Sequence, residues 1–219
     1  MNKGASQRAG DLSDSMNAAS MTTALGLMSG TSLDGVDAAL IETDGLTGVR
    51  PGLATTVPYP QEFRERLRRL LDGEGKVASI ERELTLLHAE AVRRLLDYAG
   101  IAASQIDVIG FHGQTLLHEP ERRRTWQIGD GGLLARATRI PVVNDFRSAD
   151  VAAGGQGAPL APLYHAALSA QLERPLAVLN LGGVGNVTWI GEGEGNLLAF
   201  DTGPANALLD ESYRKGHEL

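Results

Sequence analysis

Residues 25–41 consist of an apolar stretch, a turn of small and acidic residues, and a second apolar stretch. The first stretch ends at Met28, and the second runs from Val36 to Ile41. This order predicts a β-hairpin, because glycine, serine and aspartate between two apolar runs are typical of turns. Glycine lets the backbone approach a ligand, and successive N–H groups in such turns form a concave anion site. A nucleotide-phosphate site and an ordinary tight hairpin both fit this pattern.

Two carboxylates of the turn are candidate metal ligands. Asp34 and Asp37 can hold Mg²⁺ directly or through water, because this ion usually takes one or two carboxylates together with phosphate oxygens. The candidate nucleotide-binding residues of this turn are Gly30, Thr31, Ser32, Leu33, Asp34, Gly35, Val36 and Asp37.

Residues 176–190 repeat the order of apolar strand, glycine-rich turn and apolar strand. The candidate phosphate contacts of this second turn are Gly182, Gly183 and Asn186. Two such hairpins, one in each domain, are typical of the actin-like ATPase fold of sugar kinases and Hsp70 chaperones. The chain has no Gly-x-x-x-x-Gly-Lys-[Ser/Thr] sequence, so ATP binding would not use a P-loop.

Seven short motifs follow one another in a single order along the chain. They are Gly-Leu-Met-Ser-Gly-Thr-Ser-Leu-Asp-Gly-Val-Asp (26–37), Gly-Phe-His-Gly-Gln-Thr (110–115), Gln-Ile-Gly-Asp (127–130), Asn-Asp-Phe-Arg (144–147), Gly-Gly-Gln-Gly-Ala-Pro-Leu (154–160), Asn-Leu-Gly-Gly-Val-Gly-Asn (180–186) and Phe-Asp-Thr-Gly-Pro-Ala-Asn (200–206). Together they resemble the anhydro-N-acetylmuramic acid kinase family of the sugar kinase superfamily.

This resemblance implies an ATP-dependent, Mg²⁺-requiring cytoplasmic kinase of peptidoglycan recycling. Such an enzyme opens the bridge of 1,6-anhydro-N-acetylmuramic acid with water and phosphorylates O6, which gives N-acetylmuramic acid 6-phosphate. Its partners would be ATP and the anhydro amino sugar, with no nucleic acid and no membrane, and the full-length form could be a homodimer.

Asp201 is the candidate catalytic residue. It follows a predicted strand at residues 196–200 and precedes Thr202-Gly203-Pro204, where a helix is expected to begin. A carboxylate at the end of a strand is a usual position for a catalytic group in open α/β sheets. The alternative is an N-cap of the following helix, since aspartate is a favoured cap. The resemblance implies that Asp201 is the general base.

Five further residues are candidate substrate contacts. Arg147 follows a predicted strand and could pair with the lactyl carboxylate of the sugar, or it could bridge to Asp150 on the surface. The remaining candidates are Gly155 and Gln156 in a glycine-rich loop, and His112 and Gln114 after a buried strand. The loop could be a plain turn, and His112 could be a structural histidine.

The pattern of elements predicts an α/β chain with the ribonuclease H-like core of the actin-like ATPase fold. Strands are expected at 22–28, 36–42, 52–59, 106–111, 124–128 and 140–144, and helices at 61–71, 79–98, 131–138 and 159–171. In the helix at 79–98, the expected apolar stripe is Leu84, Leu87, Ala91, Leu95 and Tyr98.

We expect three segments along the chain. Residues 1–21 are rich in serine, asparagine, alanine and glycine and predict a disordered tail. Residues 22–174 predict a complete N-terminal actin-like domain, and residues 175–219 the start of a second, truncated one. The alternative function is therefore a non-catalytic nucleotide- or sugar-binding remnant of such a kinase.

Composition excludes several other classes. A formal net charge of −7 argues against nonspecific nucleic-acid binding, and we expect Arg122-Arg123-Arg124 to be a solvated loop. The chain has no cysteine, which excludes disulfides and thiolate metal sites. No stretch approaches 18 consecutive apolar residues, so no transmembrane helix is expected.

Overall fold

A five-stranded sheet forms the centre of the computed structural model, which describes residues 21–30, 32–193, 195–206, 208–209 and 212–213. Its strand order is β3-β2-β1-β4-β7. The strands are β1 (Thr22–Met28), β2 (Gly35–Thr43), β3 (Val49–Pro58), β4 (Val108–Phe111) and β7 (Val142–Asn144). The first three are antiparallel neighbours, while β4 and β7 run parallel to β1. This mixed arrangement confirms the predicted α/β fold class.

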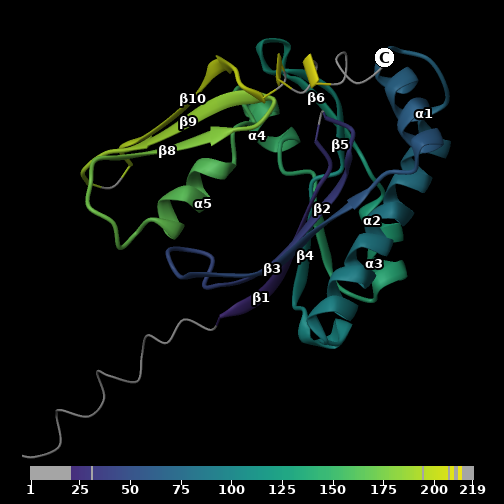
Figure 1. The fold of residues 1–219 in the computed structure, drawn as a ribbon, viewed down its shortest axis with the longest axis horizontal. Helices are drawn as coiled ribbons and strands as arrows, with labels where there is room; N and C mark the ends of the chain where they lie inside the picture. Colours follow the sequence, from purple (N-terminus) through teal and green to yellow (C-terminus); the bar gives the residue numbers. More distant parts are fainter. Residues whose placement is uncertain (1–20, 31, 194, 207, 210–211, 214–219) are drawn as a thin grey trace, which may run out of the picture.

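Three helices cover one face of this sheet (Figure 1). They are α1 (Gln61–Leu71), α2 (Val77–Ala99) and α3 (Gly131–Thr138). Leu25 and Leu27 of β1 are buried against them, whereas Gly26 and Met28 alternate to the other face. Alternation with period two thus gives the sheet one apolar face, whose burial against α1 and α2 is a main source of stability.

A second, three-stranded sheet lies on the other side of the five-stranded sheet, together with α5 (Figure 1). Its order is β10-β9-β8, and all its pairs are antiparallel. The elements of this side are α4 (Ser148–Ala153), α5 (Ala161–Leu168), β8 (Leu176–Leu181), β9 (Val184–Ile190) and β10 (Leu197–Pro204). A separate hairpin pairs β5 (Gln114–Glu119) with β6 (Arg124–Ile128).

Most predicted elements exist, and some differ from the prediction in their ends. The bounds of β1, β6, α1 and α3 are those predicted. The helix predicted at 159–171 is only α5, and neither β5 nor α4 was predicted. Tyr98 was wrongly placed in the apolar stripe of α2, because its side chain is 72% exposed. Residues 1–20 of the predicted tail lie outside the described residues.

Within the described part of the chain, no helix combines the length and apolarity needed to cross a bilayer.

The core contains one histidine, His88 of α2, which is fully buried. Its Nδ1 lies 2.8 Å from the Leu84 carbonyl oxygen, and its ring meets Phe111 edge to face. Burial lowers the pKa of His88 from 6.5 to about 4, because a charged imidazole would be desolvated there.

Because the pKa of His88 is lowered in the folded protein, we predict that the protein loses stability in mild acid. Between pH 6.5 and about 4 the unfolded chain binds a proton that the folded chain excludes, so the free energy of unfolding falls as pH falls through this range. At 1.36 kcal/mol per pKa unit the loss approaches about 3 kcal/mol. Urea unfolding of the wild type and of His88→Leu should show a steeper pH dependence in the wild type. His118→Gln is the control and should keep the wild-type slope. Equal slopes in all three proteins would contradict this account.

The outer face of the three-stranded sheet exposes apolar side chains, and we therefore predict that the chain self-associates. Leu179, Trp189 and Leu198 share this face by strand register, and their side chains are 58%, 38% and 59% exposed. Exposed apolar patches of this kind promote association. We expect sedimentation velocity to show concentration-dependent oligomers of the chain. Leu179→Ser/Leu198→Ser should shift the distribution toward monomer, whereas Leu46→Ser, an exposed leucine far from this sheet in sequence, should not. A wild-type chain that stays monomeric at all concentrations would refute the prediction.

Candidate active site

The turn after β1 is held in a tight shape by its own backbone. Leu33 is buried and has a φ of 55°, and its amide donates to the Gly30 carbonyl at 3.3 Å. At Gly35, an added Cβ would lie 2.3 Å from the Val57 carbonyl oxygen, so only glycine fits between β2 and β3 here. Thr31 lies outside the described residues. The remaining candidates of this turn therefore lie on one fixed connection between β1 and β2.

A buried chain of hydrogen bonds supports this turn from inside the protein. The Tyr59 hydroxyl donates to Ser29 Oγ at 2.6 Å, and Ser29 Oγ donates to Gln114 Oε1 at 2.6 Å. Burial raises the pKa of Tyr59, so the phenol stays protonated and remains a donor. Gln114, 1% exposed, thus lies behind the turn, and its role as a direct sugar contact stays a prediction.

The two candidate metal ligands point outward from the same hairpin. Asp34 accepts a hydrogen bond from Ser32 Oγ at 2.7 Å, and Asp37 accepts one from Thr56 Oγ1 at 2.6 Å. Both residues are exposed, so each carboxylate keeps acceptor capacity for a hydrated cation. Within the described residues, no group of three or more acidic, histidine or cysteine side chains could hold a metal. The donor set therefore fits Mg²⁺ held by one or two carboxylates together with phosphate oxygens, rather than an all-protein metal cage.

The second turn is closed by the segment that follows β10. Asn206 donates from its amide to the Gly182 carbonyl at 2.9 Å and from Nδ2 to the Leu181 carbonyl at 2.7 Å. The Ala205 amide donates to the Gly183 carbonyl at 3.0 Å. These three bonds hold the turn between β8 and β9 against the segment after β10, and they use the carbonyl oxygens of residues 181–183.

Asp201 lies within β10, not at a strand end as predicted. It pairs with Asn186 of β9, and the strand continues past an irregularity at 201–203 to Pro204. The described helical residues after β10 begin at Asn206, so Asp201 is not the N-cap that the sequence also allowed. The physical reason is pairing with β9, which extends the strand through residues that look like a turn in isolation.

Strand register gathers polar side chains around Asp201. Asn180, Asn186 and Asp201 are direct partners on adjacent strands, so they share one face of the three-stranded sheet. All three line a cavity of about 520 Å³ between this sheet and α5. His165 of α5 also lines it, and its Nδ1 lies 2.9 Å from Thr188 Oγ1. A carboxylate, two amides and an imidazole thus line the same cavity.

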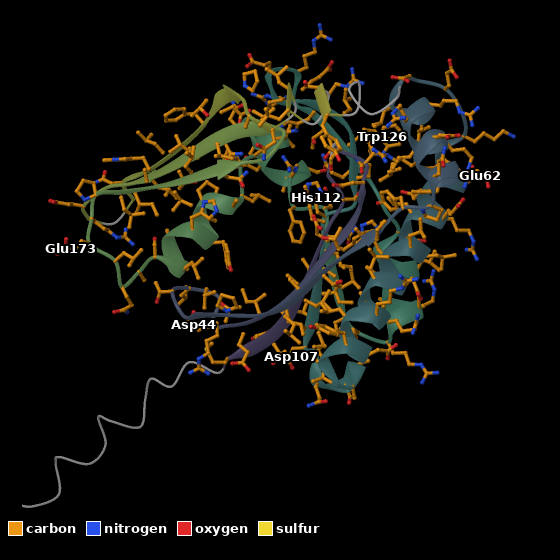
Figure 2. All side chains as sticks on the ribbon, viewed as in Figure 1. Asp44, Glu62, Asp107, His112, Trp126 and Glu173 are labelled. Atoms are coloured by element: carbon orange, nitrogen blue, oxygen red, sulfur yellow. The ribbon has the colours of Figure 1, made fainter. Side chains whose placement is uncertain are left out.

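Arg147 and His112, predicted separately as sugar contacts, are in direct contact. Arg147 Nε and Nη2 lie 3.1 and 2.9 Å from His112 Nε2, and His112 Nδ1 lies 2.9 Å from the Gly113 carbonyl. In this arrangement Nδ1–H donates to Gly113 and Nε2 accepts from Arg147. Burial, with the nearby Arg147 charge, lowers the pKa of His112, and burial also lowers the pKa of Arg147. Figure 2 shows His112 between α2 and the three-stranded sheet.

The glycine-rich loop is anchored by Asp150 of α4. Its carboxylate accepts the Gly157 amide at 2.7 Å, and its carbonyl accepts the Gly155 amide at 2.8 Å. Asp150 thus caps the loop instead of pairing with Arg147, the surface alternative that the sequence left open. Gln156 is exposed at the loop surface.

Four residues of this site were not predicted from the sequence. They are Ser29, Tyr59, His165 and Asn180. Ser29 and Asn180 lie inside motifs that had been recognised, so their position next to the turns was a usable signal. Tyr59 and His165 contact the site only through tertiary packing, and no local pattern marks them.

The sequence of this chain matches one known protein family and several of its members. The model of the family described as anhydro-N-acetylmuramic acid kinase matches residues 22–219. An anhydro-N-acetylmuramic acid kinase of Paramagnetospirillum magneticum is 68% identical over 188 residues, which cover 86% of this chain and 53% of that protein. One of Rhizorhabdus wittichii is 60% identical over 197 residues, covering 86% and 54%. The chain thus spans about half the length of the curated relatives it matches.

Solved structures give more distant matches. YeaZ from Pseudomonas aeruginosa is 19% identical with a TM-score of 0.30, over 84% of this chain and 68% of that one. A reductive activator for a corrinoid, iron-sulfur protein is 12% identical with a TM-score of 0.40, over 84% and 31%.

The buried chain behind the first turn predicts a specific loss of stability. Ser29→Ala removes both hydrogen bonds and leaves the Tyr59 hydroxyl and Gln114 Oε1 without this partner, so the free energy of unfolding should fall by about 1–3 kcal/mol. Urea unfolding at neutral pH measures it. Ser32→Ala, in the same turn but exposed, is the matched control and should cost less than about 0.5 kcal/mol. Equal losses in the two variants would show that the buried bonds are not what stabilises the turn.

Proposed function

This chain belongs to the anhydro-N-acetylmuramic acid kinase family, and from that premise we propose that it carries the catalytic base and phosphate-binding turns of such a kinase. The proposed reaction opens 1,6-anhydro-N-acetylmuramic acid with water and phosphorylates O6 from ATP. The observation that carries the proposal is the cavity in which Asp201 lies beside Asn186, Asn180 and His165.

Asp201 acts as general base in this proposal. Its carboxylate takes a proton from a water molecule that attacks the anomeric carbon of the sugar. The bond from this carbon to O6 breaks, and O6 takes the γ-phosphoryl group of ATP. The products are N-acetylmuramic acid 6-phosphate and ADP, with the proton on Asp201 released afterwards. A glycosidase needs a second carboxyl group to protonate its leaving oxygen, whereas here the phosphoryl group replaces that proton.

The two glycine-rich turns supply the phosphate side of the reaction. Phosphoryl transfer depends mainly on positioning and on neutralising charge, which backbone N–H groups in turns can provide. Mg²⁺, when bound, would neutralise phosphate charge. Asp34 and Asp37 are the residues that would hold it, because they are exposed and retain free carboxylate lone pairs.

Arg147 and the glycine-rich loop form the proposed sugar-recognition side. Two guanidinium nitrogens contact His112 Nε2, which orients the group and leaves other N–H donors for the lactyl carboxylate. Gly155 and Gln156 lie on a loop that Asp150 holds in place, so their backbone can contact sugar hydroxyls without a large ordering cost. Gln114 and Ser29 would act by fixing the first turn.

The chain spans about half the length of these relatives, so the complete reaction is proposed for the kinase as a whole. We propose that residues 22–174 form one domain and residues 175–219 the start of a second, with a cytoplasmic location as in the family. The alternative hypothesis is that the chain is a remnant of such a kinase that binds nucleotide or sugar but does not catalyse the reaction.

Replacing the proposed base tests the function. We expect Asp201→Asn to lower turnover of the anhydrosugar by about 10²–10⁴-fold while ATP binding is retained, because the amide keeps the shape but cannot take a proton. The assay uses a chimera that continues this chain with the remaining length of the Paramagnetospirillum kinase, and product 6-phosphate is measured by mass spectrometry.

Asp97→Asn, an exposed aspartate of α2, is the matched control and should keep full turnover. Near-normal turnover in Asp201→Asn would assign the base to another residue. A chimera that phosphorylates glucose or glycerol but not the anhydrosugar would reject the proposed substrate.

A further inference from the structure

A second cavity, of about 400 Å³, lies between the β5–β6 hairpin and α4. It shares no lining residue with the cavity around Asp201. Its lining is mixed, with apolar, hydroxyl and cationic groups. The lining includes Leu117, Arg123, Arg124, Trp126, Val151 and Ala152.

The floor of this cavity is an exposed aromatic ring. Leu117 and Trp126 are direct partners across the hairpin, so their side chains share the face that packs toward Val151 and Ala152 of α4. Trp126 is nevertheless 48% exposed, which is unusual for so large an apolar side chain. The label in Figure 2 marks its position. This half-exposed indole, flanked by apolar side chains, offers a flat surface for a planar or ring-shaped group.

The rim of the cavity carries positive charge. Arg122 and Arg124 share one carboxylate, Glu119, at 3.7 Å each. Arg123 has a φ of 54°, which turns the chain sharply at the hairpin tip, and within the described residues its guanidinium has no hydrogen bond or ion pair. The lining contains two arginines and no acidic residue, in a chain whose formal net charge is −7. An unpaired guanidinium beside an aromatic ring suits the carboxylate or phosphate of a small molecule.

We propose that this cavity binds a small organic anion, with its carboxylate or phosphate on Arg123 and Arg124 and its flat apolar part on Trp126. The arginine run is then part of a ligand site rather than a plain solvated loop. The proposal does not depend on the kinase reaction. Val151 lies between this cavity and the glycine-rich loop. It lines the cavity, and its Cγ2 lies 2.6 Å from where a Cβ on Gly157 would be.

Fluorescence of Trp126 measures this binding directly. The chain has two tryptophans, so Trp189→Phe leaves Trp126 as the single reporter. The dilute protein is titrated with benzoate, with phenyl phosphate and with the neutral benzyl alcohol. We expect a saturable change with at least one of the two anions and none with benzyl alcohol. The stronger of the two anions identifies carboxylate or phosphate as the preferred group.

The arginines are tested in the same background. Arg123→Gln/Arg124→Gln should weaken binding of the anion by about tenfold or more, since two charge-assisted contacts are removed. Both side chains are exposed, so the fold should persist, and far-ultraviolet circular dichroism checks this. Arg136→Gln, an exposed arginine of α3, is the matched control and should bind as before. No saturable change with either anion, an equal response to benzyl alcohol, or undiminished binding in the double variant would overturn the proposal.

Discussion

Two buried hydrogen bonds, from Tyr59 to Ser29 and from Ser29 to Gln114, join three segments that lie apart in the sequence. Tyr59 directly follows β3, Ser29 directly follows β1, and Gln114 starts β5. A buried polar group without a partner is costly, so these side chains hold one another in a single arrangement. The turn that begins at Gly30 directly follows Ser29, the residue that makes both of these hydrogen bonds. Its shape therefore depends on this buried contact as well as on the backbone of the turn itself.

The second half of the site is organised by strand register. Pairing among β8, β9 and β10 aligns Asn180, Asn186 and Asp201 in one row, and α5 closes the space above them. A shift of one residue in the pairing of β9 with β10 would move Asp201 to the opposite, apolar face. The bonds from Asn206 to the loop between β8 and β9 oppose such a slip. The chemistry proposed for Asp201 thus rests on backbone pairing.

Local patterns predicted much of this fold. The predicted bounds of helix α3 are confirmed, and its N-terminus is capped by Asp130, which accepts the Leu133 amide at 2.8 Å. Strand β5 was missed because residues 114–119 do not alternate strictly between apolar and polar, and they form a strand by pairing with β6. The two glycine-rich turns were recognised from their composition, whereas the extension of β10 through Asp201 requires its partner strand. Tyr59 could not be identified because 30 residues separate it from Ser29.

Amide hydrogen exchange tests most directly whether the buried bonds hold the turn between β1 and β2. In the folded chain the Leu33 amide bonds to the Gly30 carbonyl, and the residue 59 amide bonds to the Asp34 carbonyl. If the account is right, Tyr59→Phe lowers protection of these two amides by about tenfold, while the Ile109 amide, bonded to the Pro141 carbonyl, is unchanged. Unchanged protection at both turn amides would contradict the claim that the turn depends on this buried contact.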